Sequence, residues 1–140
     1  MNELKTKIQS ILRDDETLMR LLDKTSKPFG IYFARPPLVN PPLPLLTFKL
    51  IGGSTGYGHR EAQVRELVLQ IVAYSATSCD QIMERVEELL NLSTAFTDME
   101  ALDVLNIQLD SIGPDDFDIE FNCYTLMHRY RVFITKIPTR

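Results

Sequence analysis

Proline and glycine are concentrated in one short part of this chain, and that concentration limits the folds available to it. Five of the eight prolines and four of the six glycines lie between residues 36 and 58. Proline removes a backbone donor and glycine adds conformational freedom, so both interrupt helices and central strands. This part of the chain is therefore predicted to hold short strands separated by long connections.

Alternating segments around these connections are predicted to be strands. Residues 31–34 form a short apolar run, and residues 45–51 alternate apolar and polar side chains after the proline-rich connector. Residues 63–74 alternate over a longer stretch, and both of their faces are partly apolar. One face carries Leu67, Leu69, Ile71 and Ala73, and the other carries Glu66, Val68, Gln70, Val72 and Tyr74. The second face is predicted to meet another sheet or a neighbouring subunit.

Two segments have the periodicity of amphipathic helices. Residues 2–13 carry apolar side chains at helical spacing, and a short helical segment follows that either Asp14 or Asp15 can cap. Ser78 and Gln81 match a capping box at the start of the second helix. Its apolar stripe consists of Ile82, Met83, Val86, Leu89 and Leu90.

The remaining segments complete the fold prediction. Residues 105–109 alternate as a half-buried strand, a turn is predicted at residues 113–116, and residues 121–136 form a final long strand. Residues 93–103 are compatible with either a loop or a helical turn. The order α-β-β-β-α-β-β predicts an α+β fold with a largely antiparallel sheet of about five strands. The length predicts a single domain over residues 1–140.

Composition and charge exclude several classes of protein. The net charge is −4, whereas nucleic-acid binders usually carry a basic surplus. No apolar run approaches the roughly 18 residues of a membrane span, so no membrane association is predicted. The N-terminus has a mixed-charge helical pattern rather than that of a secretory signal. Cys79 and Cys123 lie far apart in the sequence, and synthesis in a reducing cytosol is the simplest interpretation.

Phosphate, metal and nucleophile motifs are incomplete. The glycine-rich segment at residues 52–58 lacks the lysine, the serine or threonine and the following helix of a phosphate loop. Asp115, Asp116, Asp118 and Glu120 do not have the spacing of a calcium loop, which favours a solvated acidic turn. No metal and no cofactor are therefore predicted.

Enzymatic activity is not predicted either. Cys79 would lie in the first turn of a helix, where a thiolate can be stabilised, but nothing places a histidine near it. Cys123 and His128 are five residues apart on one strand, so they point to opposite faces.

A basic stripe on the sheet is an alternative interpretation. Arginines and tyrosines could interleave there to bind single-stranded nucleic acid. The residues involved would be Arg60, Arg65, Arg129 and Arg131 with Tyr57, Tyr124 and Tyr130. The acidic net charge instead favours pairing of these arginines with Glu61, Glu66 and neighbouring subunits.

The order of these segments resembles a known family over nearly the whole chain. The segments concerned are Leu21-Leu22, Ile31-Tyr32, Leu45-Leu46-Thr47-Phe48, the run from Val68 through Ser78 into the helix, and Tyr130-Arg131-Val132-Phe133-Ile134. In this order they resemble the tail terminator, or tail completion, proteins of long-tailed bacteriophages. The connector here is richer in proline than is expected for that family.

The resemblance implies a structural virion protein of the tail neck, assembled in the cytoplasm of a bacterial host. Such a protein forms a homo-oligomeric ring, expected to be a hexamer, at the head-proximal end of the tail tube. The ring stops polymerisation of the major tail tube protein and joins the tail to the head connector or stopper protein. DNA only passes through its lumen. Another neck or head-tail connector protein and a small nucleic-acid-binding α+β module remain alternatives.

Two segments are predicted to carry this function. A flexible inter-strand loop at residues 52–60 can become ordered on docking, with Tyr57 as an anchor and Arg60 as a charged contact. The docking loop comprises Gly52, Gly53, Ser54, Thr55, Gly56, Tyr57, Gly58, His59 and Arg60. The acidic turn would suit the channel, because like charge keeps DNA from adhering as it passes. Its candidate channel-facing residues are Asp115, Asp116 and Asp118.

Overall fold

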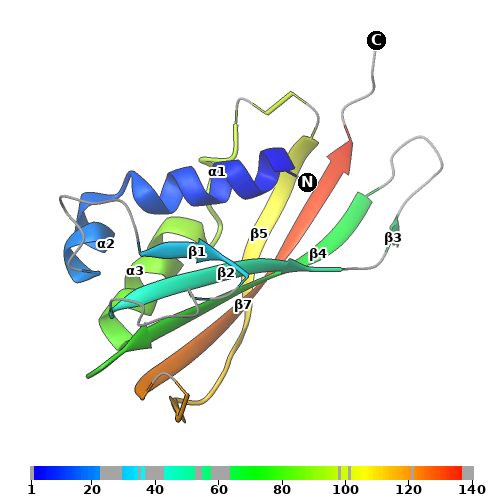
Figure 1. Cartoon of the computed structure of the whole chain (residues 1–140). Helices are drawn as coiled ribbons and strands as arrows, with labels where there is room; N and C mark the ends of the chain where they lie inside the picture. Colours follow the sequence, from blue (N-terminus) through cyan, green and yellow to red (C-terminus); the bar gives the residue numbers. More distant parts are fainter. Residues whose placement is uncertain are drawn as a thin grey trace.

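The described part of the chain folds as three helices packed on one twisted sheet (Figure 1). The computed structural model describes residues 2–22, 30–34, 36, 43–52, 55–57, 64–97, 99–100, 102–120 and 122–136. The helices are α1 (Asn2–Arg13), α2 (Glu16–Leu21) and α3 (Asp80–Leu90). The strands are β1 (Ile31–Phe33), β2 (Leu45–Ile51), β3 (Thr55–Tyr57), β4 (Val64–Ser75), β5 (Leu102–Ile112), β6 (Asp116–Asp118) and β7 (Cys123–Lys136).

The sheet confirms the predicted α+β class. Its main path runs β1-β2-β4-β7-β5, while β3 joins β4 and β6 joins β7, which makes seven strands within the described residues. Among the strand pairs that the structure describes, β1–β2 is parallel and the others are antiparallel. The five strands of the main path agree with the predicted number, and the two short strands are additions to it.

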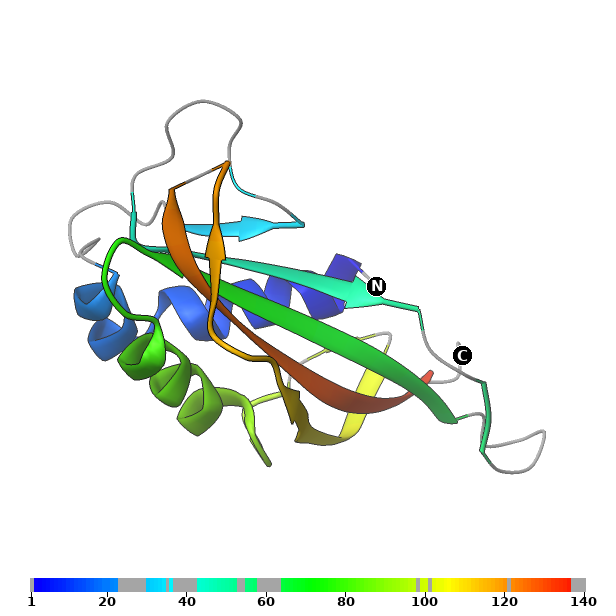
Figure 2. The same ribbon diagram turned by 90° about the horizontal axis from the view of Figure 1, so that it is seen from below.

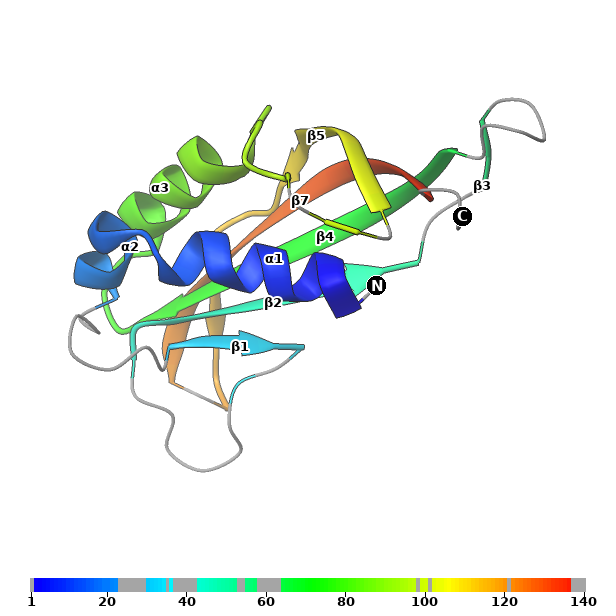
Figure 3. The same cartoon turned by 90° about the horizontal axis from the view of Figure 1, so that it is seen from above.

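All three helices cover the same face of the sheet (Figures 1 and 3). Leu4, Ile8 and Leu12 follow one another at one-turn spacing along α1 and are fully buried. The cross-strand neighbours Leu69 of β4 and Tyr130 of β7 are fully buried beneath the helices. Burial of apolar area on this face supplies most of the driving force for folding. The predicted apolar face of β4 is therefore the core face, as the burial of Leu67, Leu69, Ile71 and Ala73 shows.

An N-cap and an ion pair together join α2 to α3. Asp15 is the cap, since its Oδ2 accepts a hydrogen bond from the backbone N–H of Leu18 at 2.8 Å. Arg85 of α3 donates to the same carboxylate through Nε at 2.8 Å and through a terminal nitrogen at 2.6 Å. The hydrogen bond from Arg85 holds the pKa of Asp15 below its ordinary value. The stability contribution of this group is present above the ordinary carboxyl pKa and is lost as the pH falls through the lowered one.

Asp15→Ala is expected to lower the free energy of unfolding at pH 7 by about 2 kcal/mol, because it removes both the cap and the ion pair. Asp15→Asn retains a capping side chain and is expected to lose about half as much. Urea denaturation measures both values. Asp14→Ala is the matched control, since Asp14 is exposed and its carboxylate accepts a hydrogen bond from Ser10 Oγ within the same helical turn. If Asp14→Ala and Asp15→Ala lowered the free energy of unfolding equally, the stabilising role of the Asp15 carboxylate would be contradicted.

The start of α3 differs from the predicted capping box. The helix begins one residue later than expected, with Cys79 at the N-cap and no side-chain cap bond. Ser78 Oγ instead accepts from the backbone N–H of Asp80 at 3.3 Å. The Cys79 thiol is turned into the core, which explains why the N-cap residue supplies no oxygen to the helix.

The chain reversal predicted at residues 113–116 is wrong. The backbone N–H of Gly113 donates to the carbonyl of Met127 at 2.7 Å, so the ladder with β7 continues past β5. Pro114 lacks a donor, and the strand is interrupted there without turning back. β6 then resumes pairing on β7, and the reversal falls between Asp118 and Cys123, which are register partners.

Residues 91–97 form no helix and anchor the end of α3 to β5. Asn91 Oδ1 accepts from the backbone N–H of Leu109 at 2.7 Å, and the N–H of Leu92 donates to the carbonyl of Ile107 at 2.8 Å. Phe96 is buried in the core. Of the two predictions for residues 93–103, a loop or a helical turn, the structure shows a loop over residues 93–97.

Candidate assembly surface

The second face of the sheet lies opposite the helices, and none of the described helices covers it (Figure 2). Register places Val68 and Val72 of β4 on this face with Met127 and Arg131 of β7. Val68, Val72 and Met127 are half-buried although no helix contacts this face. The prediction that both faces of β4 are partly apolar is confirmed. We call this surface the open face.

Polar side chains form cross-strand pairs in the middle of the open face. Arg131 Nε lies 3.2 Å from Glu66 Oε1 and 3.0 Å from Asp110 Oδ1. Arg129 Nε donates to Gln70 Oε1 at 3.1 Å. Two of the sheet arginines are thus engaged with neighbouring strands, and the predicted pairing of Glu66 with an arginine is confirmed. This network weakens the nucleic-acid interpretation.

The tyrosines expected in a basic stripe do not share that surface. Tyr130 is fully buried under the helices, and burial raises the pKa of its hydroxyl group. Tyr124 lies on the helix side of β7, as its register partner Ser75 does. Arg60 lies outside the described residues, as does the side chain of Tyr57. A stacking platform of arginines and tyrosines is therefore not formed by the residues that the structure describes.

The predicted docking loop contains a strand. Thr55 and Tyr57 pair with the start of β4, at Arg65 and Val64, and so form β3. The pairing of β2 with β4 ends at Val68, but β4 begins at Val64. The backbone groups on that edge of the first residues of β4 are therefore available to a second strand. The prediction that residues 52–60 are a loop throughout is therefore wrong for residues 55–57, which form a strand.

The remaining docking-loop residues are only partly described. Gly52 is exposed, and a Cβ atom added there would meet nothing within 4 Å. Gly53, Ser54, Gly58, His59 and Arg60 lie outside the described residues, and the side chains of residues 55–57 do too. β3 lies at the far end of β4, away from α2 and α3 (Figure 3).

The acidic segment lies in a hairpin with exposed aromatic side chains. Asp115 and Asp116 are exposed and Asp118 is half-buried, and Asp116 Oδ1 accepts from the backbone N–H of Phe117 at 2.8 Å. Phe117 pairs edge-to-face with Tyr124, with ring centroids 5.2 Å apart. The two rings are 45% and 46% exposed. The expected solvated acidic turn is therefore a mixed acidic and apolar surface.

The thiols are not suited to nucleophilic chemistry. Cys79 Sγ lies 3.4 Å from the carbonyl oxygens of Ala73 and Tyr124, and burial raises the pKa of this thiol to about 11. The possibility of a stabilised thiolate at Cys79 is not supported, because burial of the sulfur disfavours its charged form. Burial also raises the pKa of Cys123 and lowers the pKa of His128. Among the described residues, no group of three or more histidine, cysteine or acidic side chains could hold a metal ion.

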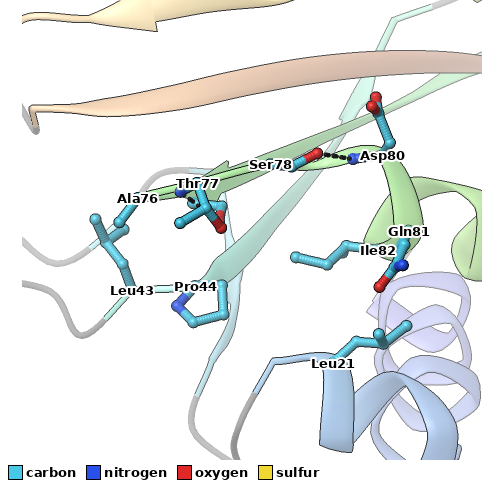
Figure 4. A pocket seen from close by; sticks show the side chains of 10 residues that line it. Leu21, Leu43, Pro44, Ala76, Thr77, Ser78, Asp80, Gln81 and Ile82 are labelled. Carbon is cyan, nitrogen blue, oxygen red and sulfur yellow. Dashed lines mark hydrogen bonds between the residues drawn. The ribbon is translucent and has the colours of Figure 1, made fainter.

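A pocket of about 650 Å³ lies between α2, the start of β2 and the β4–α3 connection (Figure 4). Leu21, Leu43 and Ile82 form apolar parts of its described wall. Two of its hydroxyl groups accept hydrogen bonds within the connection: Ser75 Oγ from the N–H of Thr77 and Ser78 Oγ from the N–H of Asp80. Its polar groups therefore stabilise the turn into α3.

None of the helices in the described part of the chain is both long enough and apolar enough to cross a membrane.

Comparison with known proteins adds one relationship. No protein-family model matches the chain, and no curated protein matches it in sequence. Among solved structures, it is similar to a chain of the "Virion of native gene transfer agent (GTA) particle", with a TM-score of 0.65 and 13% sequence identity. The similarity covers 94% of this chain and 94% of that chain. At this identity the comparison shows a shared fold over nearly the full length of both chains.

Proposed function

We propose that this protein is a structural component of a phage-like virion and acts as its tail terminator. The observation that carries the proposal is the fold shared, over nearly its whole length, with a chain of a gene transfer agent virion. The order of sequence segments supports the same role independently, because it resembles the tail terminators of long-tailed phages. Neither argument requires a catalytic site, a metal or a cofactor.

In this role the protein forms a ring, expected to be a hexamer, on the head-proximal end of the tail tube. The ring stops addition of tail tube subunits and presents a second surface to the head connector or stopper protein. The particle is assembled in the bacterial cytoplasm, and DNA passes through the lumen of the ring. The half-buried apolar side chains of the open face, such as Val68 and Val72, support the need for a covering partner.

The two candidate segments lie at opposite ends of the central strand pair. β3 pairs with Arg65 near the start of β4, whereas β6 pairs with Thr125, which lies opposite Tyr74 near the end of β4. Tyr74 lies nine positions beyond Arg65 along an extended strand, a span of about 30 Å. We assign docking on the tube to residues 52–60 and the channel surface to Asp115, Asp116 and Asp118. This separation allows one subunit to contact the tube and another component at the same time.

Electron microscopy of the purified protein, alone and mixed with polymerised tail tube protein, tests this function. We expect rings, or caps at one end of each tube, and no further elongation of capped tubes when tube subunits are added. Tubes incubated without the protein are the control and should continue to elongate. Monomers that leave the tubes open would overturn the terminator role. Binding to isolated head connectors without capping would favour another position in the neck.

A further inference from the structure

One edge of the sheet is formed by a segment whose charged side chains are all acidic. Residues 102–122 include six acidic side chains and no lysine, arginine or histidine. These acidic residues are Asp103, Asp110, Asp115, Asp116, Asp118 and Glu120. The segment forms β5 and β6, which both pair with β7 and therefore lie along the same edge (Figure 1). A run of like charge at a sheet edge repels an identical edge, so two copies cannot join there symmetrically at low cost.

The same edge exposes an apolar cluster. Phe117 and Tyr124 form an edge-to-face pair, and Ile119 at the adjacent turn is 88% exposed. Ile112, at the end of β5, is also more than half exposed. Exposed apolar side chains that adjoin one another and are rimmed by charge are typical of protein contact surfaces. We call Ile112, Phe117, Ile119 and Tyr124, with Asp116 and Asp118, the acidic edge.

The opposite edge of the sheet has complementary chemistry. At β1, the Phe33 ring is 44% exposed, packs edge-to-face on Phe48 with centroids 5.5 Å apart, and lies 4.2 Å from the Lys5 ammonium group. Lys49 is exposed on β2, directly after the partner residue of Phe33. We call Lys5, Phe33 and Lys49 the basic edge.

We propose that the acidic edge of one copy docks on the basic edge of a second copy of this chain. Phe117 would cover the exposed ring of Phe33 on the helix side of the sheet. Asp116 and Asp118 alternate with Phe117 toward the open face, where Lys49 also lies, so they would face Lys49. β1 and β5 stand at opposite ends of the strand order, so the contact is head-to-tail. Head-to-tail contacts leave both outer edges free and generate closed rings when the rotation between copies permits. The inference deepens the proposed ring function and rests on it for its biological meaning.

Two variants, each defective at one edge, test this contact. Phe117→Ala/Ile119→Ala removes the apolar part of the acidic edge, and Lys5→Glu/Lys49→Glu reverses the charge of the basic edge. Sedimentation equilibrium up to millimolar concentration at low salt measures self-association. The wild type is expected to associate. Each variant alone is expected to have a dissociation constant for self-association at least about tenfold higher. Leu92→Ala is the matched control, because Leu92 is 65% exposed but lies outside both edges.

A mixture of the two variants gives the decisive result. The intact acidic edge of the lysine variant can dock on the intact basic edge of the aromatic variant, so we expect 1:1 heterodimers that grow no further. Circular dichroism and thermal unfolding confirm that each variant is folded. A wild type that stays monomeric throughout the range, or a mixture without heterodimers, would overturn the contact. Self-association of the lysine variant as strong as that of the wild type would indicate a contact that does not use the basic edge and would also overturn the proposal. Tube capping by the wild type is scored separately, so failure of this contact is distinguishable from failure of the terminator role.

Discussion

Deleting residues 54–58 is expected to leave a folded protein that no longer attaches to tail tubes. Within this segment, β3 is a short strand that pairs with the start of β4 at two positions, Arg65 and Val64. Loss of this short pairing should therefore lower the free energy of unfolding by about 1 kcal/mol. Docking should fail because the deletion removes Tyr57 and half of the proposed contact segment. Co-sedimentation with polymerised tubes measures attachment, and urea denaturation measures the fold.

Replacing residues 54–58 with Gly-Ser-Gly-Ser-Gly provides the matched control for this deletion. The replacement keeps the length of the connection but removes the side chains and the preference for a strand. If side chains make the contact, the replacement should fail to attach as the deletion does. If it attaches normally while the deletion does not, only the length of the connection matters. Normal tail joining by the deletion variant would remove residues 52–60 from the docking surface.

Leu69→Ala is expected to destabilise the isolated protein far more than Val68→Ala. Leu69 is fully buried on the helix-covered face of β4, whereas its neighbour Val68 is half-buried on the open face. Truncating a buried leucine costs about 3 kcal/mol through lost transfer energy and the cavity left behind. Val68→Ala should cost about 1 kcal/mol or less, because water already reaches part of that side chain.

Thermal unfolding distinguishes the two substitutions directly. For a domain of this size, a loss of about 3 kcal/mol lowers the melting temperature by roughly 10 °C, against a few degrees for Val68→Ala. Equal shifts would show that the helices do not define the core face. In assembled particles the difference should shrink if the open face becomes covered, because Val68 would then lose contacts with a partner as well.

Elements with a strong local periodicity could be predicted from the sequence. The bounds of α1 agree with the expected 2–13 segment, and the stripe of α3 is buried at Ile82, Met83, Val86 and Leu90. The alternation of β4 correctly separates a core face from a second, partly apolar face. Such patterns repeat within a few residues of chain, so the sequence contains all of the information needed to recognise them.

The errors fall where strands distant in sequence decide local structure. Gly113 and Pro114 carry a turn signal, yet β7 holds this segment in line through the bond from Gly113 to Met127. The glycine-rich loop contains β3 because β4 offers it an unpaired edge. Ser78 has the sequence of a cap, but the helix starts after Cys79, whose thiol is held in the core.

The acidic segment shows the same limit in the candidate site. Its charge was evident from Asp115, Asp116 and Asp118, but nothing in the local sequence joins Phe117 to Tyr124. Their pairing arises because β6 folds back on β7, which brings two rings seven positions apart to a centroid distance of 5.2 Å. An acidic turn thereby becomes an exposed apolar and acidic surface.

Periodicity and charge are properties of neighbouring residues, so they were sufficient to predict the fold class, the main helices, the long strands and the acidic character of the second half. The folded chain was needed to establish which sheet face is covered, where the chain reverses and which charges lie beside exposed aromatic rings. Those features depend on the register of strands far apart in the chain, such as Leu69 opposite Tyr130 and Asp116 opposite Thr125. Register is set by the joint burial of many side chains from different strands, so no short stretch of sequence is enough to predict it.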